Sequence, residues 1–142
     1  MNDLVATLGI ANLSKSQVSE MAKDLDSMVE DLCPRPLDSG PYYYLSCDAL
    51  TMKVREVGRV VKTSVLLATG VNNDGYRELL GMHVATAESV ASWTGFFQDL
   101  KARGLRGVFL VTSDAHEGIQ HAISEVLPDA SWQRCRTHFA KN

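Results

Sequence analysis

Apolar residues recur at helical spacing along the first part of the chain. Leu4, Val5 and Leu8 fit one face of a short helix that Gly9 closes. Ser14 and Gln17 have the spacing of a capping box, which predicts the start of a second helix. An amphipathic stripe follows that start: Val18, Met21, Ala22, Leu25, Met28, Val29 and Leu32. Residues 1–32 are therefore predicted to form a short helix, a turn and a longer amphipathic helix.

The pattern then changes from helical to strand-like. Residues 33–41, "CPRPLDSGP", hold three prolines and a glycine and are predicted to be an extended linker. Alternating and β-branched residues predict three strands, at 42–54, 59–70 and 76–84. Short turns separate them, one at residues 56–58 and one at Asp74-Gly75. An antiparallel meander is expected.

The first of these strands contains a carboxylate in an unusual place. Successive side chains of a strand point to opposite faces, so Leu50, Met52 and Val54 share one face, which we expect to be the core face. Asp48 has the same parity. An unpaired carboxylate in an apolar medium costs several kcal/mol or more. Asp48 is thus predicted to have a partner: a hydrogen-bond donor, a basic side chain or a metal ion.

The second half alternates helix and strand. "ESVASWTGFFQDLKARGL" predicts a helix, and the continuous apolar run at residues 108–111 predicts a strand that is covered on both sides. A further helix, "EGIQHAISEVLP", stops at Pro128, and "SWQRCRTHF" predicts a short last strand. The order β-β-β-α-β-α-β predicts an α/β domain over residues 42–142.

Composition and charge narrow the class of protein. The chain has 142 residues, 45% of them hydrophobic, which suits one domain with a small appendage. Three cysteines, Cys33, Cys47 and Cys135, favour a reduced, cytosolic chain, and neither a membrane span nor a signal peptide is visible. Residues 1–50 carry 3 basic and 8 acidic side chains, whereas residues 51–142 carry 11 and 9. The second part therefore permits a phosphate-bearing partner.

Asp48 and a second acid suggest a metal site. Asp114 follows the buried strand and precedes a helix, at the sheet edge where open α/β sheets bind ligands. Taken alone, Asp114 is as well explained as a helix N-cap, and Asp48 as half of a buried salt bridge. A fourth strand lying beside the first would bring the two acids together, and adjacent carboxylates repel unless a cation lies between them. Oxygen ligands suit Mg²⁺ or Mn²⁺, and a pair of such ions supports phosphodiester chemistry.

Five segments, taken in order, resemble a known family. They are "CDALTMKVRE", "GVNNDGYRELLGMHV", "ESVASWTGFFQDLKARGL", "VTSDAHEGIQHAISEVLP" and "WQRCRTHFAKN". Together they resemble the Mutator family of DDE transposases, in particular its bacterial insertion-sequence branch, and they cover about residues 38–142. The resemblance implies an RNase H-like core and metal-dependent strand cleavage and transfer at transposon ends. It also implies a cytoplasmic, nucleoid-associated bacterial protein.

The resemblance assigns roles to particular residues. It makes Asp48 and Asp114 catalytic metal ligands, and it draws attention to Cys135 and His138, which are interpreted either as half of a zinc site or as packed, hydrogen-bonded residues. His116 and Glu117 are interpreted as touching the site or as exposed loop residues.

The chain also departs from the family pattern. Ala115 stands where the family usually has Gly, and the family's third acid lies well beyond the Cys-x-x-His segment. Glu117 and Glu125 come too early to match that acid. We therefore expect this chain to correspond only to the N-terminal part of a transposase, truncated before the third acid.

Residues 1–32 fit the DNA-binding region that such proteins place before the core. In a helix-turn-helix, Lys15, Ser16 and Gln17 would enter the groove, and Arg134 and Arg136 are further candidates for DNA contact. A plain helical hairpin for packing or dimerisation is the alternative, favoured by the acidic residues of the later turns. Terminal repeats and target DNA are the expected partners, together with other copies of the chain.

Three functions remain open at this stage. The first is a piece of a DDE transposase. The second is a catalytically dead, truncated chain that acts by binding DNA or a full-length partner. The third is an unrelated Mg²⁺-dependent hydrolase with two acids.

Overall fold

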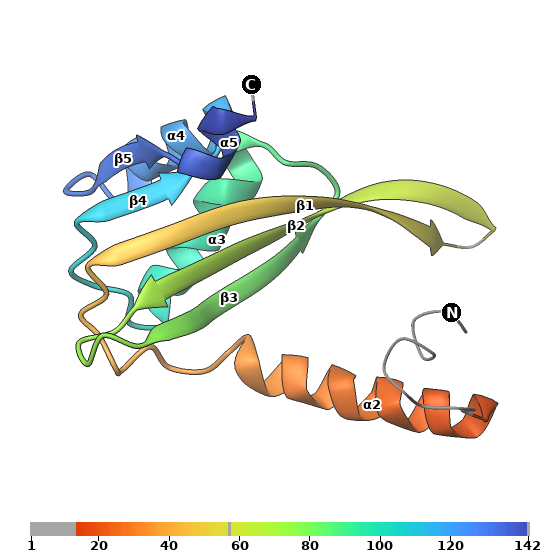
Figure 1. Ribbon diagram of the computed structural model, residues 1–142. Helices are drawn as coiled ribbons and strands as arrows, with labels where there is room; N and C mark the ends of the chain where they lie inside the picture. Colours follow the sequence, from red (N-terminus) through yellow and green to blue (C-terminus); the bar gives the residue numbers. More distant parts are fainter. Residues whose placement is uncertain (1–13, 57, 142) are drawn as a thin grey trace. The chain divides into compact units, whose positions relative to one another are not determined.

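A computed structural model describes residues 14–56 and 58–141 (Figure 1). Its elements are α2 (Lys15–Leu32), β1 (Tyr44–Glu56), β2 (Arg59–Val71), β3 (Arg77–Ala85), α3 (Val90–Ala102), β4 (Leu110–Ser113), α4 (Glu117–Val126), β5 (Ser131–Arg134) and α5 (Arg136–Ala140). The chain divides into two compact units, Met1–Pro34 and Arg35–Asn142. The short helix predicted near residues 4–8 lies outside the described residues.

Helix α2 begins where the sequence predicts. The Ser14 hydroxyl accepts a hydrogen bond from the Gln17 backbone N–H at 3.2 Å, and the Gln17 side-chain oxygen accepts one from the Ser14 N–H at 2.9 Å. These two bonds satisfy backbone donors that a helix start otherwise leaves without partners. The helix ends at Leu32, shortly before Pro34, so the predicted longer helix is confirmed.

The second unit is built on a five-stranded sheet of order β3-β2-β1-β4-β5. β1 pairs antiparallel with β2, and β2 with β3, which forms the predicted meander. β4 pairs parallel with β1 and β5 with β4, and this is the RNase H-like order that was expected. The last strand is shorter than predicted, because the chain turns into α5 after Arg134.

The hydrophobic core lies between one face of the sheet and the helices α3 and α4, which Figure 1 shows on that side. Helix α3 contributes its buried aromatic residues, and Trp93 and Phe97 stack with ring centroids 5.7 Å apart. The sheet contributes Leu45, Leu66 and Val111, all nearly inaccessible to solvent. Burying a side chain of this size stabilises the fold by about 1.5–3 kcal/mol. Within the described part of the second unit, α3 and α4 lie on the same face of the sheet. They therefore leave the opposite face uncovered.

The predicted facing of β1 is wrong. Leu50, Met52 and Val54 are 48%, 50% and 38% exposed, whereas Leu45 and Cys47 are only 2% and 3% exposed. The odd-numbered residues at the start of β1 therefore face the helices, and Asp48 points to the opposite face and is exposed. The apolar alternation was misleading because both faces of this strand carry apolar residues. Asp48 consequently needs no buried partner, and the buried salt bridge considered for it is also excluded.

The predicted linker belongs to the core from Arg35 onward. The Leu37 side chain is 1% exposed, and the Leu37 backbone N–H donates to the Arg103 carbonyl at 2.7 Å. Arg35 pairs with Glu78 at 3.1 Å. Prolines keep this segment extended, but Leu37 adds apolar burial that a solvated linker would lack. Only residues 33 and 34 of the predicted linker lie outside the second unit.

Glu78 ties the start of the second unit to its sheet. Its carboxylate accepts hydrogen bonds from the Asn72 amide at 2.6 Å, the Arg35 guanidinium at 3.1 Å and the Tyr42 hydroxyl at 3.0 Å. The bond from Asn72, reinforced by those from Arg35 and Tyr42, holds the pKa of Glu78 below its ordinary value. Glu78 therefore has a structural role at the edge of the sheet remote from Asp114.

Candidate functional site

Asp48 and Asp114 occupy matching positions on neighbouring strands. β1 and β4 run parallel, with Tyr44 opposite Leu110 and Ser46 opposite Thr112. Asp48 comes two residues after Ser46, and Asp114 comes two residues after Thr112, immediately beyond the end of β4. Side chains two positions apart return to the same face of a strand. The register thus sets both acids at the same height along two adjacent strands.

Both carboxylates keep most of their hydrogen-bonding capacity. One Asp48 oxygen, Oδ1, accepts the backbone N–H of Ala49 at 3.0 Å. One Asp114 oxygen, Oδ1, accepts the backbone N–H of His116 at 3.2 Å. Across residues 14–56 and 58–141, neither acid belongs to an ion pair. Each acid retains an oxygen, Oδ2, that is available to a cation.

Asp114 is not the cap of the helix that follows it. His116 is the N-cap of α4, and its Nδ1 accepts the backbone N–H of Gly118 at 3.1 Å. The cap interpretation of Asp114 is therefore wrong. The bond from the His116 N–H to Asp114 Oδ1 closes the turn that precedes α4. Because His116 caps α4, the Asp114 side chain is not used as the N-cap of that helix.

A second acid, Glu88, lies near the turn after Asp114. Its carboxylate accepts the indole N–H of Trp93 at 3.0 Å and lies 3.4 Å from the Nδ1 of His116. Ser89 caps α3 through a capping box with Ser92. Glu88 and Ser89 thus make structural contacts at the start of α3.

A shallow hollow opens beside Asp114. It has a volume of about 450 Å³ and is lined by Asp114, Ala115, His116, Arg134, His138 and Lys141. The fold thus gathers Asp114, Arg134 and His138, which the sequence proposed separately. Arg136 and Glu117 are exposed and do not line it. One carboxylate among basic and imidazole groups suits an anionic ligand that also carries a cation.

Two polar atoms at this hollow are buried without a partner in the described part of the chain. They are Arg134 Nε and His138 Nδ1. The Arg134 guanidinium lies over the Phe139 ring, 5.6 Å from its centroid. This cation–π contact holds the guanidinium plane while its remaining N–H groups stay free to donate.

Cys135 is the N-cap of α5 and does not line the hollow. Hydrogen bonds from the backbone N–H groups of His138 and Thr137 lower the pKa of the Cys135 thiol. Cys47 and Cys135 are free thiols. Among residues 14–56 and 58–141, no three His, Cys, Asp or Glu side chains are grouped to hold a metal ion. Cys135 and His138 would therefore supply only two of the ligands of a zinc site. The interpretation of both as packed, hydrogen-bonded residues is the simpler one.

The two aspartates fit Mg²⁺ or Mn²⁺ in chemistry but form only part of a ligand set. Their free oxygens are hard donors of the kind that these cations prefer. A magnesium site in proteins is commonly held by one or two carboxylates, with waters and substrate phosphates in the other positions. The donor set is thus compatible with a metal that binds together with its substrate.

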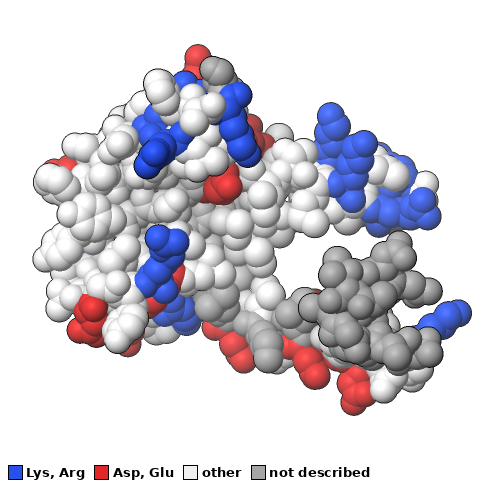
Figure 2. All heavy atoms as spheres, in the orientation of Figure 1, with Lys and Arg blue, Asp and Glu red and all other residues white. Residues whose placement is uncertain are grey.

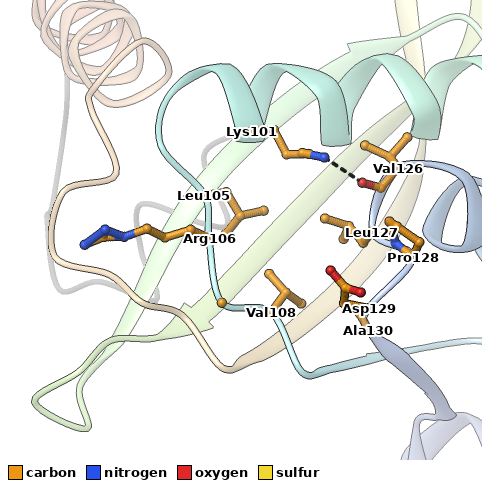
Figure 3. Close-up of a pocket in the computed structure, with 10 residues that line it drawn as sticks. Lys101, Leu105, Arg106, Val108, Val126, Leu127, Pro128, Asp129 and Ala130 are labelled. Carbon is orange, nitrogen blue, oxygen red and sulfur yellow. Dashed lines mark hydrogen bonds between the residues drawn. The ribbon is translucent and has the colours of Figure 1, made fainter.

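A second hollow lies at the opposite end of β4 and β5, beside the segments that lead into these strands (Figure 3). It has a volume of about 230 Å³, and Leu105, Val108 and Leu127 contribute much of its wall. Lys101 Nζ donates to the Val126 carbonyl at 3.0 Å and so stabilises the last turn of α4. This hollow precedes β4, whereas ligands of parallel strands bind beyond the carboxyl ends. We regard it as a packing feature.

Sequence reasoning missed one group of candidate residues. Lys53, Arg55, Arg59 and Lys62 stand on the paired ends of β1 and β2 and are all exposed. A signal was present in the sequence, because two consecutive strands have an excess of basic residues. That excess entered only through the charge of residues 51–142.

The strand order and the paired acids define a chain with an RNase H-like α/β core. The sequence profile described as "Transposase, Mutator family" matches residues 1–142. The chain therefore belongs to the Mutator family of transposases. Within the described residues, no helix has the length and apolar character of a membrane span.

Known proteins show the same relationship. The chain is 62% identical over 142 residues to the transposase for insertion sequence element IS1081 of Mycobacterium tuberculosis, covering 100% of this chain and 34% of that protein. It is 42% identical over 142 residues to the transposase for IS256 in transposon Tn4001 of Staphylococcus aureus, covering 100% and 36%. The chain thus spans about a third of the length of these relatives. Among solved structures, the HTLV-2 integrase catalytic core with magnesium aligns at 12% identity and a TM-score of 0.46, over 76% of this chain and 68% of that one.

Proposed function

We propose that this chain is part of a transposase that cleaves and joins DNA strands at the ends of an insertion sequence. The observation that supports the proposal is the parallel register of β1 and β4, in which Ser46 pairs with Thr112 two residues before Asp48 and Asp114. Membership in the Mutator family supports the DNA substrate. A nucleoid-associated location and self-association in a transposition complex are parts of the same proposal.

The two acids have distinct roles in this proposal. Asp48 lies on a central strand and faces the open side, so it can serve two neighbouring cations at once. Asp114 lies on the turn before α4, where it accepts the His116 backbone N–H, and serves one cation. When bound, a pair of Mg²⁺ or Mn²⁺ ions would activate the attacking oxygen and stabilise the leaving oxygen of a phosphodiester.

The basic side of the hollow suits the DNA backbone. Arg134 and Lys141 line the wall that Asp114 completes, and a guanidinium binds phosphate through paired N–H donors. These side chains would orient the scissile phosphate toward the two acids.

The described residues supply two acids, so we propose that the third comes from sequence that the longer relatives have and that this chain does not match. The isolated 142-residue chain is then expected to leave transposon-end DNA uncut. A regulatory role, in which such a chain binds DNA or a full-length partner without cutting, is the alternative that this shortage of ligands favours.

The test compares cleavage by an extended protein with cleavage by its variants. The chain is joined to the remaining length of its IS1081-type relative and incubated with labelled terminal-repeat DNA in Mn²⁺ or Mg²⁺. Asp48→Asn and Asp114→Asn should each abolish nicking, while the exposed control Asp129→Asn should nick as the parent does. Nicking that survives in Asp114→Asn would overturn the assignment of that residue. Turnover of small phosphate esters without any action on DNA would instead favour an unrelated hydrolase.

A further inference from the structure

The ends of β1 and β2 form a two-stranded arm that extends past the rest of the sheet. β3 pairs with β2 only over Ser64–Val71, and β4 pairs with β1 only over Tyr44–Ser46. Residues 52–56 and 59–63 therefore pair with each other alone, and we call them the basic arm. Figure 1 shows the two strands running on together beyond the ends of β3 and β4.

The charge of the arm is strongly one-sided. It contains four basic side chains and one acidic side chain: Lys53, Arg55, Arg59, Lys62 and Glu56. The four basic side chains are exposed, and in the described part of the chain none of them belongs to an ion pair. Figure 2 shows lysine and arginine side chains gathered at the far end of the arm. The arm is thus a local positive surface on a chain whose net charge is −3.

The pairing within the arm places like charges together. Lys53 is directly opposite Lys62, and Arg55 is opposite Val60, so three cations share one face. Like charges directly opposite one another destabilise a strand pair. This arrangement does not serve the stability of the arm, and an anion lying along that face would remove the repulsion.

The opposite face of the arm is mixed. It carries Met52 and Val54, which are 50% and 38% exposed, and also the basic residue Arg59. A two-stranded ribbon of this kind has the width that the major groove of DNA admits, with cations on one side to meet phosphates. Asp48 belongs to this mixed face by its parity in β1, so the face that carries three cations is turned away from that acid.

We propose that the basic arm binds the phosphate backbone of duplex DNA, independently of base sequence. The proposal rests on the DNA substrate proposed above and adds a contact surface to it.

The experiment measures DNA binding by the 142-residue chain at a series of salt concentrations. A labelled duplex of arbitrary sequence, about three helical turns long, is titrated by fluorescence anisotropy. The arm variant Lys53→Gln/Arg55→Gln is compared with a control of the same composition, Lys101→Gln/Arg106→Gln, in the segment that leads into β4. Thermal melts of both variants show whether each remains folded.

The arm variant should bind about tenfold or more weakly at moderate salt. The slope of log affinity against log salt should fall by about 2, because each lost phosphate contact removes about 0.9. Duplexes of different sequence should lose affinity equally, and the control should stay within about twofold of the unmodified chain. Lys53→Glu/Arg55→Glu should weaken binding further.

An equal loss of DNA affinity in the arm and control variants would contradict the proposed role of the basic arm. It would leave the proposed DNA substrate unaffected. Absence of binding by the folded, unmodified chain at low salt would overturn both proposals. A change of oligomeric state in the arm variant, seen by light scattering without a change in DNA affinity, would show that the arm contacts another copy of the chain instead.

Discussion

Asp48 and Asp114 lie at the same height on two neighbouring parallel strands, each two residues beyond the pair formed by Ser46 and Thr112. Asp48 belongs to the middle of a long strand, and Asp114 to the turn after a short one. The alignment follows from the parallel register and from the His116 cap, which leaves the Asp114 carboxylate outside the start of α4.

Divalent cations should bind this pair weakly in the absence of DNA. Two carboxylates and water hold Mg²⁺ poorly, so millimolar metal should stabilise the fold by less than about 1 kcal/mol. Mn²⁺ should broaden the backbone amide NMR signals of residues near 48 and 114. Asp48→Asn should abolish that broadening, and Asp129→Asn should preserve it. Broadening centred on another part of the sheet would place the metal elsewhere.

Replacing Leu37 should show that the proline-rich segment is part of the core. The side chain is 1% exposed, so Leu37→Ala should lower the free energy of unfolding by about 2–5 kcal/mol. Asp38→Ala, at an exposed neighbouring position, should change it by less than about 0.5 kcal/mol. Urea denaturation monitored by circular dichroism measures both. A chain that starts at Pro34 should melt cooperatively, and one that starts at Ser39 should be destabilised. Equal effects of the two substitutions would restore the interpretation of a free linker.

The exposed apolar face of β1 should limit solubility more than stability. Leu50 and Met52 are about half exposed, so Leu50→Thr/Met52→Thr should reduce aggregation while changing the melting temperature little. Leu45→Thr, on the helix-covered face, is the matched control and should destabilise the fold, because its side chain is 2% exposed. Light scattering and thermal melts distinguish the two effects. Unfolding of the double variant would mean that these residues are buried in solution.

Cys135 and Cys47 should differ in the pH at which an alkylating reagent modifies them. Hydrogen bonds from the N–H groups of His138 and Thr137 lower the pKa of Cys135, so Cys135 should react with iodoacetamide at a lower pH in the folded chain than in urea. Burial raises the pKa of Cys47 to about 12, so Cys47 should stay unmodified until the chain unfolds. Peptide mass spectrometry follows each site. Identical pH profiles for Cys135 in the folded and urea-treated chain would contradict the hydrogen-bonded thiol.

The pKa shifts of Cys135 and Cys47 make the stability of the fold depend on pH in opposite directions. A lowered folded pKa for Cys135 contributes stability above the ordinary thiol pKa, and this stability is lost as pH falls through the folded value. The pKa of Cys47 is raised in the folded chain, so this thiol stabilises the fold below its ordinary pKa of 9.0. That stability is lost as the pH rises toward about 12. Cys47→Ala should therefore reduce the loss of stability between about pH 9 and 12.

The element order was predictable because its signals are local. The capping box at Ser14, the Asp74-Gly75 turn and the aromatic stripe of α3 each act within a few residues, and each is found where the sequence indicates. The neighbouring positions of β1 and β4 were also predictable, since a β-β-β-α-β order leaves few ways to build one sheet.

Which face of β1 is covered was decided only by tertiary structure. Its two faces carry similar apolar residues, and the helices α3 and α4 select Leu45 and Cys47 because these lie where the helices pack. The burial of Leu37, the capping by His116 and the gathering of Arg134 and His138 beside Asp114 likewise depend on partners distant in the sequence. Local pattern thus determined the elements and their order, whereas long-range packing determined which side chains the elements leave exposed.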